Sequence, residues 1–150
     1  MLSIEEFLGY VESALDQQLA IVAGLGDERS NRRPALEAAN SPYAILTHCL
    51  GVMEYWAGEV VAGRPIQRDR AAEFQATGTV AELGRRVDAA KAKLRADVAT
   101  AEPAAPPRVP PPGPPEPGLT TQGGVLMHIY EELAQHLGQL ELTRDVLLAG

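Results

Sequence analysis

The chain has little of what several protein classes require. It has a single cysteine, Cys49, which argues against an intrachain disulfide framework and against a zinc site built from paired cysteines. Its 13 basic residues are outnumbered by 20 acidic ones, so neither a nucleic-acid-binding face nor a polybasic membrane anchor is expected. No apolar run approaches the ~20 residues that span a bilayer, and no basic region leads into an apolar stretch as in a signal peptide. The cytoplasm is therefore the expected location.

Strand patterns are missing as well, because no alternating β-branched run is bounded by turn residues. What remains are four segments with apolar residues at helical spacing. The predicted helices cover residues 3–24, 41–63, 79–100 and 122–148. Capping boxes open the first helix at Ser3 and Glu6 and the third at Thr79 and Glu82. Four long amphipathic helices in 150 residues predict an all-α four-helix bundle forming a single domain over residues 1–150.

The connections differ in composition. Residues 25–40 read as a polar loop and residues 64–78 as a charged connector. Residues 101–120 contain nine of the twelve prolines, a density that no helix or central strand tolerates. This segment is predicted to be a long, extended proline-rich loop between the third and fourth helices. One hypothesis makes it a polyproline ligand for a partner protein, although such segments more often act as passive spacers.

Ionisable residues lie inside two of the apolar stripes. The second helix places His48 on its core-facing side, and the fourth places Glu132 and His136 there, four residues apart and so neighbours on one face. The stripe of the fourth helix otherwise consists of Val125, Ile129, Leu133, Leu140 and Leu147. A buried carboxylate is costly unless it is paired. Two imidazoles and a carboxylate suit a divalent metal, and three protein ligands with a vacant position are the catalytic zinc pattern.

Two alternatives stay open at this stage. His128 lies eight residues before His136, about 12 Å along a helix, so both cannot easily reach one ion. The ligand pair on the fourth helix is therefore either Glu132 with His136 or His128 with Glu132. The three polar residues could also form a hydrogen-bond network without any metal.

Two segments carry a resemblance to a known family. PYAILTH at residues 42–48 and HIYEELAQHLGQ at residues 128–139 resemble the DinB superfamily, and more closely its mycothiol-dependent branch of maleylpyruvate isomerases and thiol S-transferases. The resemblance covers nearly the whole chain and implies a four-helix bundle of DinB type with a divalent metal at one end, usually zinc, with nickel or another ion as alternatives. It implies His48, Glu132 and His136 as the ligands. It moves His128 to a supporting or packing position, and Gln139 becomes a candidate for orienting a ligand.

The resemblance also implies a function. It predicts a metal-dependent enzyme that binds a low-molecular-weight thiol such as mycothiol and transfers it to an electrophile or uses it in isomerisation. The alternatives are a non-catalytic metal-binding bundle and a metal-dependent hydrolase acting through activated water. No catalytic residue beyond the ligands is assigned, and a homodimer is compatible with the superfamily.

Charged and reactive residues outside the stripes receive less weight. Arg68 and Arg70 are candidates for binding a carboxylate of the cofactor. Asp69 and Glu73 are interpreted as members of surface ion pairs, which are common and weak. Cys49 is interpreted as a small buried hydrophobic residue and not as a nucleophile.

Overall fold

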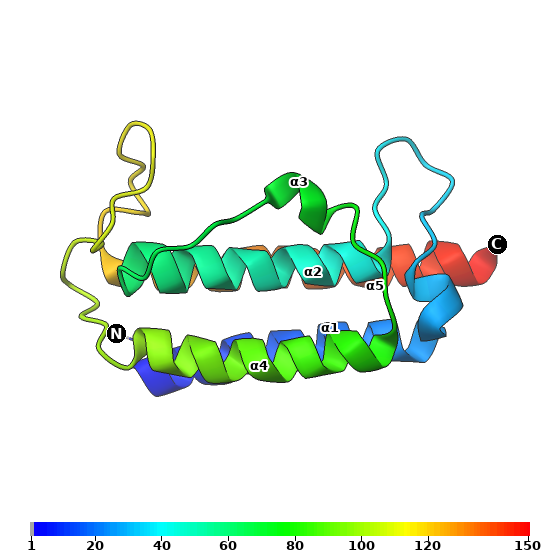
Figure 1. Cartoon of the computed structure of the whole chain (residues 1–150), viewed down its shortest axis with the longest axis horizontal. Helices are drawn as coiled ribbons and strands as arrows, with labels where there is room; N and C mark the ends of the chain where they lie inside the picture. Colours follow the sequence, from blue (N-terminus) through cyan, green and yellow to red (C-terminus); the bar gives the residue numbers. More distant parts are fainter. Residues whose placement is uncertain (1) are drawn as a thin grey trace.

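The computed structural model describes residues 2–150, and this part of the chain is all-α with no strand, as predicted. The elements are α1 (Ile4–Ser30), α2 (Pro42–Met53), the π-helix η1 (Glu54–Val61), α3 (Arg70–Glu73), α4 (Val80–Val98) and α5 (Gln122–Ala149). Because η1 continues α2 without a break, four long helical segments run side by side (Figure 1). α1 packs against α4 and α5, and the rod formed by α2 and η1 packs against the same two helices.

Local sequence signals explain most of the helix starts and the core. Both predicted capping boxes are present, at Ser3 with Glu6 and at Thr79 with Glu82. Ser41 caps α2 through the backbone N–H of Ala44, with proline at the first helical position. The five apolar positions predicted to face inward from the last helix are all buried: Val125, Ile129, Leu133, Leu140 and Leu147. No helix in the described residues is long and apolar enough to cross a membrane.

The first helix extends further than predicted. We expected it to end near Gly24, but α1 reaches Ser30 and is interrupted at Gly26, where φ is 74° and ψ is 173°. This left-handed φ is one that glycine adopts without steric cost. The prediction of a loop from residue 25 is therefore wrong for residues 27–30, which form one further helical turn after the kink.

The second helix changes its winding. A single α-helix over residues 41–63 was expected, but the backbone widens to a π-helix over Glu54–Val61 and ends before Gly63, whose φ is 75°. π-helical segments are rare, and those that occur are frequently located at functional sites. The amphipathic spacing that predicts helix does not distinguish the two windings, because both place apolar residues on the core side.

The connector between the second and third long helices is not a plain loop. It crosses over α2 and contains the short helix α3 (Figure 1). Asp69 caps this helix by accepting a hydrogen bond from the backbone N–H of Ala72. This short helix directs Glu73 toward α2, where its side chain is buried.

The proline-rich segment contains no helix or strand over residues 101–121, and it is fastened to the helices at both ends. The backbone N–H groups of Arg108 and Val109 donate to the carbonyl of Val60 at 2.9 and 3.2 Å. Gln122 donates its side-chain amide to the carbonyl of Pro106 at 3.0 Å. The last carbonyls of a helix lack partners inside it, so the loop satisfies an acceptor that η1 leaves free.

The core can be tested with a pair of leucines on one helix. Leu140 is 0% exposed and Leu142 is 70% exposed, both on α5. We expect Leu140→Ala to lower the free energy of unfolding by about 2–5 kcal/mol, because it removes buried methyl groups and leaves a cavity. Leu142→Ala should change it by less than ~0.5 kcal/mol. Urea denaturation followed by circular dichroism measures both, and equal effects would contradict this placement of the core.

Candidate metal centre

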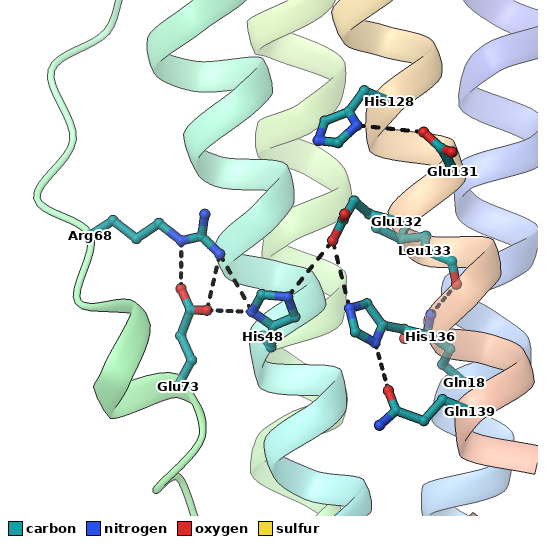
Figure 2. Close-up of polar contacts among 10 residues, drawn as sticks. All are labelled: Gln18, His48, Arg68, Glu73, His128, Glu131, Glu132, Leu133, His136 and Gln139. Carbon is teal, nitrogen blue, oxygen red and sulfur yellow. Dashed lines mark hydrogen bonds and ion pairs between the residues drawn. The ribbon is translucent and has the colours of Figure 1, made fainter. Parts of the chain in front are cut away.

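Three side chains from two helices converge at one point. His48 comes from α2, and Glu132 and His136 come from α5; one ligand atom from each lies within 4.8 Å of the others. Glu132 Oε2 is 3.6 Å from His136 Nε2 and 3.9 Å from His48 Nε2 (Figure 2). A tetrahedral ion with bonds of ~2.1 Å separates its ligand atoms by about 3.4 Å. These three residues could therefore hold a divalent ion after small side-chain movements.

Both imidazoles are oriented for this role by partners on their other nitrogen. His48 Nδ1 lies 2.7 Å from Glu73 Oε2, and His136 Nδ1 lies 2.8 Å from Gln139 Oε1 (Figure 2). Because both partners are acceptors, each Nδ1 carries the proton and donates it. Each Nε2 then keeps its lone pair and points it toward Glu132. Histidines that bind metals almost always have such an outer partner, which fixes their tautomer and ring orientation.

Glu73 is itself held by Arg68. Arg68 Nε donates to Glu73 Oε1 at 2.7 Å and Nη2 donates to Oε2 at 3.0 Å, a two-pronged pair. Arg68 Nη2 also approaches His48 Nδ1 at 3.5 Å, but the shorter contact with the carboxylate decides where the imidazole proton lies. The interpretation of Glu73 as part of a surface ion pair is wrong, because its carboxylate is buried against the candidate ligand His48.

Asp69, the other residue interpreted as part of a surface ion pair, forms no ion pair among the described residues, and the two arginines have separate roles. Asp69 is exposed and caps α3. Arg70 is also exposed and lies over the ring of Phe74, 5.4 Å from its centroid. Phe74 in turn stacks on the imidazole of His48, with ring centroids 4.6 Å apart. The connector therefore covers His48 with the carboxylate of Glu73 and the ring of Phe74, and Arg68 holds that carboxylate in place.

Sequence reasoning missed Glu73 because one helical turn in a charged connector has no periodicity. One signal was present: Gly51, in the interior of α2, three residues after His48. A Cβ at position 51 would overlap the carboxylate of Glu73. Glycine inside a helix costs about 1 kcal/mol relative to alanine, and a close approach is one reason for a helix to carry it; at position 51 it leaves room for the Glu73 carboxylate.

Burial acts differently on the two titratable groups of α2. Burial lowers the pKa of His48, against the opposing effect of its hydrogen bond to Glu73, and so favours the neutral imidazole that a metal requires. Burial raises the pKa of the adjacent Cys49 thiol to about 12. Cys49 is 0% exposed and stays protonated, so it is a buried hydrophobic residue and not a nucleophile.

The centre is closed on the α2 side and open on the α5 side. The side chain of His48 is 3% exposed, whereas those of Glu132 and His136 are 29% and 22% exposed. His128 lies outside this three-residue cluster. Its Nδ1 is 3.6 Å from Glu131 Oε2, and its ring meets Trp56 edge-on at a centroid distance of 4.8 Å. Of the two pairs that the sequence left open, the structure brings Glu132 and His136 together with His48.

The chain is similar to a known protein family. A model of the mycothiol-S-transferase family matches residues 6–149. The matched segment includes all three residues of the cluster and every long helix except the first two residues of α1. No curated protein and no solved structure matches the chain.

The orienting role of Glu73 predicts a change in metal affinity. Glu73→Ala removes the acceptor from His48 Nδ1, and we expect zinc affinity to fall about 10–100-fold, as for other outer partners of metal ligands. Glu131→Ala is the matched control, since Glu131 is an exposed carboxylate beside His128. Titration against a competing chelator measures both. Equal affinities in the two variants would show that Glu73 does not orient the site.

Gly51 offers a second test, in which the effect of an alanine on helix stability and its effect on metal affinity are measured separately. Alanine at position 51 improves helix propensity by about 1 kcal/mol but displaces Glu73. We expect Gly51→Ala to weaken zinc binding about tenfold and to gain none of that stability. Gly9→Ala is the control, because a Cβ there meets nothing within 4 Å and should stabilise the fold. An affinity unchanged by Gly51→Ala would contradict the close approach of Glu73.

Proposed function

The chain belongs to the mycothiol S-transferase family, and we propose that it is a metal-dependent enzyme that transfers a low-molecular-weight thiol to an electrophile. We propose His48, Glu132 and His136 as the ligands of a divalent ion, with zinc as the first candidate and nickel as an alternative. Mycothiol is the proposed thiol because of the family. An isomerase that uses the same thiol as a cofactor would need the same site.

One observation carries this proposal: the two Nε2 atoms and the Glu132 carboxylate converge while both Nδ1 atoms are engaged by acceptors. With both imidazoles neutral and protonated on Nδ1, the two Nε2 lone pairs face the carboxylate across 3.6 and 3.9 Å and form no hydrogen bond with it. A cation between these atoms turns three mutually unfavourable acceptors into ligands. Three protein ligands leave a further coordination position for a substrate, as in catalytic sites and not structural ones.

The chemistry follows from the donor set. A divalent ion bound here would lower the pKa of a thiol and hold it as the thiolate, the nucleophilic form. Glu132 contributes one negative charge and the histidines none, so the site keeps enough positive charge to favour an anionic sulfur. In the transfer, a sulfur electron pair forms the new C–S bond, the leaving group departs with the electrons of the broken bond, and the thiol proton passes to solvent.

The chain's own residues define where the thiol approaches. The α2 side is closed by Glu73 and Phe74, so the approach is from the exposed side of Glu132 and His136. Arg68 and Arg70 remain proposed contacts for a carboxylate of the cofactor. Arg68 would have to divide its N–H groups between that carboxylate and Glu73, whereas Arg70 is exposed and holds only an aromatic ring.

The three histidines of the chain provide the test. We expect purified protein to bind about one divalent ion per chain and His48→Ala and His136→Ala to lose it, since each removes one of three ligands. His128→Ala is the matched control and should keep the ion, because its ring packs on Trp56 outside the cluster. Elemental mass spectrometry measures the metal, and consumption of mycothiol with an alkylating electrophile measures transfer.

Each alternative gives a different result in this experiment. Loss of metal in His128→Ala with retention in His136→Ala would show that His128, and not His136, is the ligand. Metal without thiol consumption would leave a metal-binding protein, and ester hydrolysis without thiol would indicate a hydrolase. A folded parent that takes up no ion would contradict the proposal.

A further inference from the structure

A cavity lies between η1 and the proline-rich loop, outside the metal cluster. Its volume is about 500 Å³, and its lining combines the rings of Tyr55 and Trp56 with seven prolines of the loop. Among the described residues that line it, Glu116 alone carries a charge. Cavities of about 300–1,000 Å³ with apolar walls and few polar groups are typical of small-molecule sites. The size and chemistry of this cavity therefore suit a small, mostly apolar ligand.

The cavity is adjacent to the candidate metal centre through two side-chain contacts. Trp56 meets the ring of His128 at 4.8 Å, and His128 precedes Glu132 by one helical turn, or about 6 Å along the axis. On the other side, Arg68 lies over the ring of Tyr55 at 5.7 Å and also holds Glu73. Each aromatic wall of the cavity therefore contacts a residue next to the metal cluster: Trp56 contacts His128, and Tyr55 contacts Arg68.

The walls are fixed before any ligand binds. Proline locks the backbone φ angle, so a segment with this proline density has few conformations to lose on binding. The loop is also tied to η1 by the hydrogen bonds of Arg108 and Val109 to the Val60 carbonyl. Because seven prolines of the segment line one cavity together with Tyr55 and Trp56, the structure favours a cavity wall over the polyproline ligand considered from the sequence.

We infer that this cavity binds the electrophile, and that the electrophile is a flat, uncharged aromatic or conjugated molecule. The inference rests on the proposed function, since it assigns the second substrate of the same reaction. Ring faces and proline methylenes offer stacking and apolar contact but few hydrogen bonds, which selects against polar aliphatic molecules. The carboxylate of Glu116 disfavours anions. The polar thiol then occupies the metal side, with the reactive carbon of the electrophile directed past His128.

The chain contains a built-in reporter, because Trp56 is its only tryptophan. We would titrate the metal-loaded full chain, without thiol, with 1,3-dinitrobenzene, a flat neutral molecule that quenches indole fluorescence on contact and whose meta nitro groups do not activate each other for displacement. The expected result is saturable quenching. Non-saturable quenching with the same linear dependence as free N-acetyltryptophanamide would overturn the inference.

Two variants with matched controls locate the binding. Tyr55→Ala removes one aromatic wall, and Pro111→Asp places a charge in the proline wall; we expect each to raise the dissociation constant about fivefold or more. Tyr10→Ala removes an exposed tyrosine elsewhere, and Pro117→Asp changes a proline of the same loop that does not line the cavity. Both controls should stay within about twofold of the parent. Saturable binding that neither cavity variant weakens would place the probe elsewhere and overturn the inference.

Folding and function are read separately. Circular dichroism melting checks that each variant folds, and the two cavity variants probe different walls, so one that unfolds leaves the other to decide. Metal content and thiol transfer to iodoacetamide, a small aliphatic electrophile, report on the proposed function alone. Transfer to iodoacetamide without saturable dinitrobenzene binding overturns only this inference. Dinitrobenzene binding without any transfer supports the cavity and contradicts the proposed function.

Discussion

The candidate site depends on one buried interaction, the hydrogen bond between Glu73 and His48. An ionised carboxylate removed from water is costly unless it is paired, and Glu73 is paired twice, with the Arg68 fork and with His48 Nδ1. This pairing fixes the imidazole tautomer and holds the connector across α2. It also explains Gly51, because only a residue without a Cβ lets the carboxylate come this close to the helix. A connection between two helices thereby becomes part of the site.

The sequence predicts the regular parts of the structure and the three central residues of the site. Capping boxes and apolar spacing locate the long helices because both signals involve residues only three or four positions apart, which can be recognised in the sequence. His48, Glu132 and His136 stand out because ionisable groups in an apolar stripe are costly without a partner. Glu73 could not be found this way, since it reaches His48 across 25 positions through a short helix with no periodicity. The kink at Gly26 was not predicted, because the sequence does not show which of the glycines near the end of the helix, Gly24 or Gly26, adopts the left-handed φ.

The π-helix escapes prediction for a different reason, and it has consequences beyond its own length. Its spacing resembles an α-helix over eight residues, so the apolar pattern cannot separate the two windings. The Val60 carbonyl near its end accepts hydrogen bonds from the backbone of Arg108 and Val109. Tyr55 and Trp56, at the beginning of the same segment, form the aromatic wall opposite the prolines. The π-helix therefore provides both the carbonyl that anchors the loop and the aromatic side chains that line the cavity.

The two histidines of the cluster are supported unequally, and this difference bears on how the site could work. His48 is buried and donates to a charged carboxylate, whereas His136 is partly exposed and donates to the neutral amide oxygen of Gln139. The carboxylate that holds His48 is itself fixed by Arg68, so the ring of His48 is the more rigidly positioned of the two. Glu132 and His136 share one helix and are partly exposed, so their side chains have more room to move than that of His48. The cluster thus joins a fixed imidazole on α2 to two partly exposed side chains on α5, and this asymmetry supports the proposal that a thiol approaches from the α5 side.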